Sequence, residues 1–242
     1  MCEGDMREIA FCITTFERPQ CCKNLVESIR QFYPNAKIYV ADQGKYTTDY
    51  EAEKIRLPYD CGLSYARNYL WRNTPEPYKL LLDDDFVFTK QTDISKFRVL
   101  IDHCDIACGG VIERGQVRNY EHDLRRVGNK LYYDQPKREW MEIEGIKCRQ
   151  VDLALNFGLF RANTDHWDDN LKICEHTDYY LRFEGKLLYT PEVLVNHLRL
   201  RPPKYKRLRR RPEFYAQFMK KHGLTEIDNG KKITRLVDGK VI

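Results

Sequence analysis

The chain has 242 residues, 42% of them hydrophobic and 32% charged, which is the composition of an ordinary globular protein. Its length suits one sizeable α/β domain or at most two small ones. An apolar run of about 18 residues, the minimum for a membrane-spanning helix, does not occur. Residues 1–5 have neither the basic nor the apolar region of a signal peptide, so we expect a cytoplasmic protein unless a targeting segment has been removed.

The net charge of +5 is unevenly distributed, because residues 199–211 hold eight Lys and Arg and no acid. Such a block binds polyanions or stays solvated. Tyr205 is its one aromatic residue, whereas single-strand-binding surfaces interleave several, so we expect no nucleic-acid partner. The block is better suited to phosphate groups, an anionic acceptor or peripheral contact with an anionic membrane. The nine cysteines lack paired CxxC spacing and are expected to be free thiols.

The N-terminal part of the chain predicts a strand, a helix and a second strand. An apolar run over residues 8–15 indicates a buried strand, and Pro19 suits the first turn of a helix over 20–32. Residues 37–41 form the next strand, which completes a right-handed βαβ unit. Ligands of such sheets bind beyond the carboxyl ends of the strands. The polar residues at those ends are Thr14, Thr15 and Asp42.

Three consecutive carboxylates, Asp83, Asp84 and Asp85, end a further apolar run that begins at Lys79. They cannot all belong to a core, because burying ionised carboxylates without partners costs too much free energy. Side chains alternate along a strand, so Asp83 and Asp85 should point to one side. Two carboxylates at a strand end suit Mg²⁺ or Mn²⁺, with a substrate phosphate completing the shell. The alternative is an acidic surface turn.

Helical and extended segments continue to alternate through the middle of the chain. A helix is expected over residues 63–73, and Arg67 on it either points back to the ligand edge or is a surface cation. Residues 46–57 are ambiguous and hold at most a short helix. Residues 92–104 indicate another helix, and 105–112 a strand.

The remainder of the chain predicts mostly antiparallel strands. Residues 120–134 indicate a hairpin or loop pair with a Gly-Asn turn, and 178–184 a helix. His197 follows the last of the extended segments, where a lone histidine is more often structural than a ligand. A helix over 212–222 and a hairpin over 233–242 with an Asp-Gly turn end the chain. The other extended segments are 140–146, 148–155, 156–161, 187–190 and 193–195.

Several motifs follow one another in a characteristic order. They are Ile13-Thr-Thr-Phe-Glu-Arg-Pro19, Val40-Ala-Asp-Gln-Gly44, Asp60-Cys-Gly-Leu-Ser-Tyr-Ala-Arg-Asn68, Leu82-Asp-Asp-Asp-Phe-Val-Phe88, Glu175-His-Thr-Asp-Tyr-Tyr180 and Val195-Asn-His197. In this order they resemble the GT-A class of nucleotide-sugar-dependent glycosyltransferases. The similarity is greatest to the inverting family 2 enzymes and the related β-1,4-N-acetylgalactosaminyltransferases. It covers about residues 7–200, and Asp60 stands where that family has Asn.

The resemblance implies a GT-A fold, an α/β architecture in which a Rossmann-like nucleotide-binding half with a mixed central sheet is fused to an acceptor-binding half. The halves would cover about residues 7–112 and 113–200 of a domain over 1–200. Residues 201–242 would form a basic C-terminal extension with a helix and a hairpin. The implied activity is a metal-dependent, inverting transfer of a hexose or N-acetylhexosamine. The donor would be a UDP-sugar, the acceptor a hydroxyl of a glycan, glycoconjugate or lipid-linked molecule, and the cofactor Mn²⁺ or Mg²⁺.

The same resemblance assigns roles to single residues. Asp83, Asp85 and His197 would hold the metal. Asp178 would be the catalytic base that accepts the proton of the acceptor hydroxyl, with Glu175 and His176 orienting it or the acceptor. The donor-binding residues would be Thr14, Thr15, Glu17, Arg18, Asp42, Arg67, Asp83 and Asp84.

Other interpretations fit the same residues. Asp178 could instead be a carboxylate near a helix N-terminus that interacts with the helix dipole. The whole chain could be a catalytically inactive module that binds a nucleotide-sugar or glycan. A third hypothesis, a polyanion-binding protein that uses residues 199–211, predicts strongly salt-dependent binding.

Overall fold

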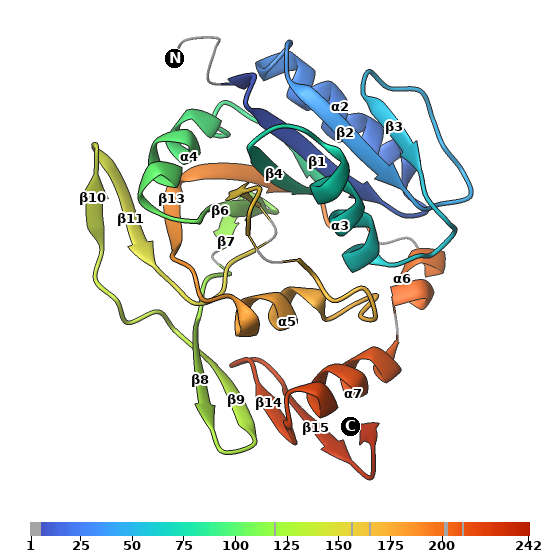
Figure 1. Cartoon of the computed structure of the whole chain (residues 1–242), viewed down its shortest axis with the longest axis vertical. Coiled ribbons are helices and arrows are strands. Elements are labelled where there is room, and N and C mark those ends of the chain that lie inside the picture. Colours follow the sequence, from blue (N-terminus) through green and yellow to red (C-terminus); the bar gives the residue numbers. More distant parts are fainter. Residues whose placement is uncertain (1–5, 119, 156, 165, 201–202, 210) are drawn as a thin grey trace.

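A mixed sheet of 11 strands is the centre of the computed structural model (Figure 1). The structure describes residues 6–118, 120–155, 157–164, 166–200, 203–209 and 211–242. The first elements are β1 (Ile9–Thr15), α2 (Pro19–Phe32), β2 (Lys37–Asp42), β3 (Glu53–Arg56), α3 (Leu63–Asn73), β4 (Tyr78–Asp83), β5 (Phe86–Val87), α4 (Ile94–Leu100), η1 (Ile101–His103), β6 (Ile106–Glu113) and β7 (Gln116–Arg118). The later elements are β8 (Asp123–Val127), β9 (Lys130–Asp134), β10 (Met141–Ile143), β11 (Ile146–Gln150), β12 (Gly158–Arg161), α5 (Glu175–Arg182), β13 (Leu187–His197), α6 (Pro203–Arg209), α7 (Pro212–Lys221), β14 (Glu226–Asp228), β15 (Ile233–Val237) and β16 (Lys240–Val241).

The expected α/β fold with a mixed central sheet is confirmed. Its strand order is β10-β11-β13-β6-β12-β4-β1-β2-β3, and β12 is antiparallel to both of its neighbours. β1 pairs in parallel with β2 and with β4. The register aligns Thr15 with Asp42 on one side and Thr14 with Asp83 on the other. The carboxyl ends of these three strands therefore meet at one edge of the sheet, as the sequence predicted.

Helices cover both faces of the sheet, which explains why its central strands are apolar throughout instead of alternating. Ile9, Phe11 and Ile13 of β1 enter a core cluster with residues of α2 and α4. Ala10 and Cys12, on the opposite face, enter a second cluster with residues of α3 and α5. The two clusters hold the sheet, and hence its carboxyl edge, in place.

Three segments differ from the sequence-based expectation. Residues 53–56 of the ambiguous stretch form strand β3, because they pair with β2. The two short strands expected around Pro191 are one strand, β13, whose register shifts between Tyr189 and Leu194; such an irregularity accommodates proline. The helix expected over 92–104 ends at Leu100 and continues as the 3₁₀ turn η1. Residue 156, the start of another expected strand, lies outside the described residues.

A second, smaller sheet joins the C-terminal part of the chain to the middle. Its order is β16-β15-β14-β9-β8, and β14 pairs in parallel with β9. Phe218 and Met219 of α7 pack against Leu131 of β9 and Leu171, which places α7 beside α5 (Figure 1). The expected hairpins over 120–134 and 233–242 are both present. Backbone pairing and apolar contacts therefore cross the predicted division at residue 200.

The eight cysteines in the described part of the chain are free thiols. Most of them are buried, and burial raises the pKa of Cys12 to about 12, so such thiols are unreactive. Among the described helices, none combines the length and apolar character that a membrane crossing requires.

Candidate active site

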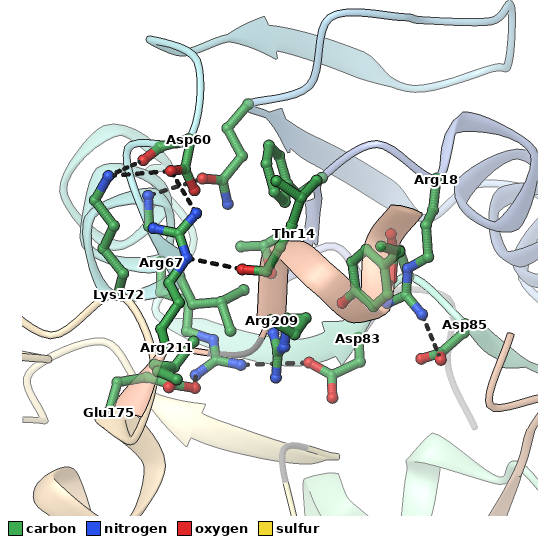
Figure 2. A pocket seen from close by; sticks show the side chains of 18 of the residues that line it. Thr14, Arg18, Asp60, Arg67, Asp83, Asp85, Lys172, Glu175, Arg209 and Arg211 are labelled. Atoms are coloured by element: carbon green, nitrogen blue, oxygen red, sulfur yellow. Dashed lines mark hydrogen bonds and ion pairs between the residues drawn. The ribbon is translucent and has the colours of Figure 1, made fainter. Parts of the chain in front are cut away.

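A cleft of about 610 Å³ lies at the edge of the sheet where β1 and β4 end. Figure 2 shows side chains from distant parts of the sequence around it. Thr14 and Asp83 line the cleft from the strand ends, and Glu175 lines it from the start of α5. Arg209 and Arg211, from the basic C-terminal segment, close it from a further side. The sheet edge, α5 and the C-terminal segment therefore share one cavity.

The three consecutive aspartates have different surroundings. The side chain of Asp83 is 29% exposed, whereas Asp84 and Asp85 are buried. Asp84 accepts a hydrogen bond from the hydroxyl of Thr15 at 2.7 Å and forms an ion pair with Arg18. Burial raises the pKa of Asp84 to about 6, although the charge of Arg18 opposes this. The same guanidinium contacts Asp85 at 2.7 Å, so Arg18 lies between two of the three carboxylates.

The C-terminal segment holds Arg18 from its other side. The guanidinium carbon lies 4.2 Å from the centre of the Tyr205 ring, within cation–π distance. Arg18 also donates a hydrogen bond to the backbone carbonyl of Leu200 at 3.0 Å. Arg18 therefore links the acidic strand end to residues that lie far along the chain. Residues 201, 202 and 210 of the basic segment are outside the described residues.

Asp85 and His197 face each other and could bind a divalent cation. His197 Nε2 lies 3.5 Å from Asp85 Oδ1. Burial on its own would raise the pKa of Asp85, but the hydrogen bond with His197 and the charge of Arg18 lower it to about 2. Within the described residues, no group of three or more His, Cys, Asp or Glu side chains is arranged to hold a metal ion. Asp83, the third predicted ligand, forms an ion pair with Arg67 at 3.3 Å.

Arg67 connects the two sides of the cleft. Its side chain is fully buried, which excludes the alternative of a surface cation. It lies 3.3 Å from Asp83 and donates a hydrogen bond of 2.7 Å to Glu175 (Figure 2). One guanidinium from α3 thus holds the carboxylate of the strand end and the carboxylate of α5 at the same cavity.

Asp178, the expected catalytic base, does not line the cleft. It is fully buried, forms an ion pair with Lys221 at 2.6 Å and is hydrogen-bonded to His222 at 2.8 Å. Although burial opposes it, hydrogen bonds from His222 and Lys221 and the charge of Arg182 lower the pKa of Asp178 to about 2. A base must reach the proton that it removes, so this position does not support the predicted role. The carboxylate that α5 presents to the cleft is Glu175.

The expected donor-binding residues divide into two groups. Thr14, Arg18, Arg67, Asp83 and Asp84 line the cleft. Thr15, Glu17 and Asp42 are not among the lining residues. Asp42 bonds instead to the backbone N–H of Gly44 at 2.9 Å and to Arg56.

The cleft also contains residues that the sequence reasoning did not select. Gln43 follows Asp42 in the second motif and accepts a hydrogen bond from the N–H of Gly62 at 2.8 Å. Asp60 forms an ion pair with Arg211 at 2.7 Å. The motif around Asp42 and the run of basic residues indicate that Gln43 and Arg211 lie near the site. Neither pattern shows which side chain faces the cavity.

Unusual backbone conformations gather around the cleft. The non-glycine residues with positive φ fall into two groups. Arg114, Glu144 and Asp238 each precede a glycine in a tight turn, where this conformation is common. Glu17, Asp60, Cys174 and Arg199 are in, or next to, segments that line the cleft. Such conformations persist where the surrounding structure enforces them, and they are frequent at functional sites.

The mixed sheet, with a cleft at the edge where β1 and β4 end, is the α/β architecture of the GT-A type. Residues 10–162, more than half of the chain, match the model of glycosyl transferase family 2, and the chain belongs to this family. The resemblance inferred from the motifs is thereby confirmed.

Curated relatives are β-1,4-N-acetylgalactosaminyltransferases. The chain is 26% identical over 231 residues to β-1,4 N-acetylgalactosaminyltransferase 2 of Mus musculus, a match that covers 89% of this chain and 45% of that protein. It is 29% identical over 203 residues to β-1,4 N-acetylgalactosaminyltransferase 1 of Rattus norvegicus, which covers 76% and 37%. The chain therefore spans less than half the length of these relatives.

Among solved structures, the fold resembles that of S. aureus TarS. The TarS 1–349 complex with UDP-GlcNAc has a TM-score of 0.60 and 14% sequence identity, and the match covers 88% of this chain and 64% of that one. The TarS 1–349 complex with UDP has a TM-score of 0.56. At this identity the likeness concerns the fold, and it confirms the expected GT-A architecture.

Proposed function

We propose that this chain transfers a hexose or N-acetylhexosamine from a UDP-sugar to a hydroxyl of a glycan or glycoconjugate, with inversion at the anomeric carbon and with Mn²⁺ or Mg²⁺. The observation that carries the proposal is that Arg67 holds Asp83 and Glu175 at one cleft of a family 2 fold. The names of the curated relatives and the sugar nucleotide bound to TarS support the same class of reaction.

The donor diphosphate would lie between the acidic strand end and the C-terminal cations. Asp85 and His197 would hold the metal, which when bound neutralises the charge of the leaving nucleoside diphosphate. Arg209 and Arg211 line the facing side of the cleft and supply further positive charge. Because Arg18 contacts Asp85 in this structure, we expect the metal and the nucleotide together to displace Arg18 from Asp85.

Glu175 would act as the general base in place of Asp178. The acceptor hydroxyl would attack the anomeric carbon on the face opposite the diphosphate, which inverts the configuration there. As the new glycosidic bond forms, the bond to the diphosphate breaks, and the hydroxyl proton passes to the carboxylate of Glu175. Arg67 orients that carboxylate through the 2.7 Å hydrogen bond.

The geometry of the cleft also bears on the two alternative functions, an inactive binding module and a polyanion-binding protein. Glu175 lines the cleft and is placed to act as a general base, so turnover that Glu175→Gln removes would distinguish an enzyme from an inactive binding module. Tyr205, Arg209 and Arg211 face the cavity, so we assign the anion-binding role of the basic segment to the donor phosphates. Membrane contact through this segment has no comparable support.

Calorimetric titration of UDP in the presence of Mn²⁺, repeated with EDTA, tests the donor site. We expect binding that requires the metal, and a loss on the order of 100-fold or more in Asp85→Asn, because even outer-shell changes cost about 10–100-fold in metal affinity. Asp134→Asn is the matched control, since Asp134 forms an exposed ion pair with Arg125 outside the cleft. UDP binding that is unaffected by EDTA and by Asp85→Asn would contradict the metal-dependent mechanism.

A further inference from the structure

A buried carboxylate that no motif indicated lies directly behind His197. Glu113 is the last residue of β6 and is 5% exposed. β6 pairs in parallel with β13, and the register aligns Ile112 with Asn196, so the next residues, Glu113 and His197, are neighbours across the two strands. Glu113 Oε1 lies 2.8 Å from His197 Nδ1.

Both carboxylate oxygens of Glu113 have hydrogen-bond partners. Oε1 also accepts a hydrogen bond from the hydroxyl of Tyr120 at 2.9 Å, and Oε2 lies 3.1 Å from Arg199. Tyr120 and Arg199 both line the cleft. A buried carboxylate with three donors is well satisfied, so it constitutes a fixed acceptor for the imidazole ring.

This acceptor determines which nitrogen of His197 is available. An ionised carboxylate can only accept a hydrogen bond, so Nδ1 must carry the proton of that contact. In this structure Nε2 also faces a carboxylate, Asp85 Oδ1 at 3.5 Å. When His197 binds a cation its ring is neutral, and the lone pair is then on Nε2, because Glu113 keeps the proton on Nδ1. Phe86 packs edge-on against the imidazole at 5.3 Å between ring centroids, which restrains the ring orientation.

We infer that Glu113 is a positioning residue of the metal site, which acts through His197 by fixing the Nδ1–H tautomer and directing Nε2 toward the cation. The inference rests on the proposed function, because it assumes that Asp85 and His197 bind the metal. Histidine ligands generally donate their second N–H to such a partner, and loss of the partner weakens metal affinity. Through Tyr120 and Arg199 the same carboxylate ties the metal ligand to two walls of the cleft.

The test measures Mn²⁺ affinity by electron paramagnetic resonance of the free ion, in the presence of saturating UDP and without acceptor. We expect Glu113→Ala to weaken Mn²⁺ binding about 10–100-fold. Glu113→Gln should lose less, because its amide oxygen can still accept the Nδ1–H bond. Because Gln also keeps the packing of Glu113, this order alone does not separate positioning from packing, and the double-mutant cycle with His197 makes that separation.

The matched control is Glu76→Gln. Glu76 is 3% exposed and has the same kinds of partners, Lys37 at 2.8 Å and Tyr39 at 3.2 Å, but it does not line the cleft. We expect wild-type Mn²⁺ affinity in this variant. If Glu113→Ala does not fold, Glu113→Gln alone decides, because its side chain has nearly the same shape.

A double-mutant cycle separates positioning from an independent effect. If Glu113 acts through His197, Glu113→Gln should not weaken Mn²⁺ binding further in a His197→Ala background. An equal loss of Mn²⁺ affinity in both backgrounds overturns the inference. Wild-type Mn²⁺ affinity in both Glu113→Gln and Glu113→Ala also overturns it. In either case Asp85→Asn still tests the metal site independently. Failure of the wild-type protein to take up Mn²⁺ with UDP overturns both the inference and the metal-dependent part of the proposed function.

Discussion

The two walls of the cleft are built by different means. On the strand side, backbone pairing between β1 and β4 sets Thr14 beside Asp83, so the sheet itself fixes the position of the acidic residues. On the other side, charged side chains add to the apolar contacts that join α5 to the C-terminal part of the chain. Asp178 binds Lys221, and Arg211 binds Asp60.

This difference predicts how each wall responds to conditions. Partly exposed ion pairs weaken as salt screens them, whereas the hydrogen bonds of a buried parallel sheet do not. Lys221 and Arg211 are partly exposed, while Thr14 is buried. We therefore expect the backbone pairing of the strand side to be insensitive to salt, and the partly exposed ion pairs of the C-terminal side to weaken as salt rises.

The largest effect should come from the residue at which the walls meet. Glu175→Gln should lower kcat by about 10²–10⁴-fold, the usual contribution of a general base. The affinity for UDP and Mn²⁺ should stay close to that of the wild type, because the metal ligands are on the strand side. Steady-state transfer assays combined with the UDP titration measure both quantities. A kcat close to the wild-type value would show that the base lies elsewhere.

The next effect concerns stability. Asp178→Asn should lower the free energy of unfolding by about 3 kcal/mol, because Lys221 and His222 lose the buried carboxylate between them. Urea denaturation measures the change. Asp134→Asn, which breaks an exposed ion pair, should cost less than about 1 kcal/mol. A catalytic base would give the opposite result, lost turnover with little loss of stability.

The same carboxylate gives a pH dependence with a defined sign. The pKa of Asp178 in the folded protein is about 2, below its ordinary value of about 3.9. Its contribution to stability is therefore complete above about pH 4 and is lost as the pH falls toward 2. The wild type should lose stability more steeply than Asp178→Asn over this interval, and parallel curves would exclude Asp178 as a source of the effect.

The smallest effect should be at the C-terminal segment. Arg211→Gln should weaken UDP binding by less than about tenfold, the scale of a partly exposed charge, and the loss should shrink at high salt. Arg235→Gln is the control, because Arg235 forms an exposed ion pair with Glu226 on the second sheet. If both variants bind UDP like the wild type at low salt, the C-terminal cations do not contact the donor.

The strand side could be predicted from the sequence because its signals are local. Asp83 follows an apolar run, and the βαβ order fixes the edge at which that run ends. No comparable local signal shows whether Glu175 or Asp178 is the carboxylate that lines the cleft. The two acids are one helical turn apart on α5, and two of the partners that enclose Asp178, Lys221 and His222, lie more than forty residues later in the sequence. Glu113 carries no motif, and only the register between β6 and β13 reveals it.

The position of β13 limits how this protein can be divided. The match to the family model ends at residue 162, yet β13 lies inside the central sheet, between β6 and β11. A fragment cut at residue 162 would lack an interior strand and would expose the edges of both neighbours, a template for aggregation. A fragment that folds must therefore extend past the residues that match the family model, at least to the end of β13.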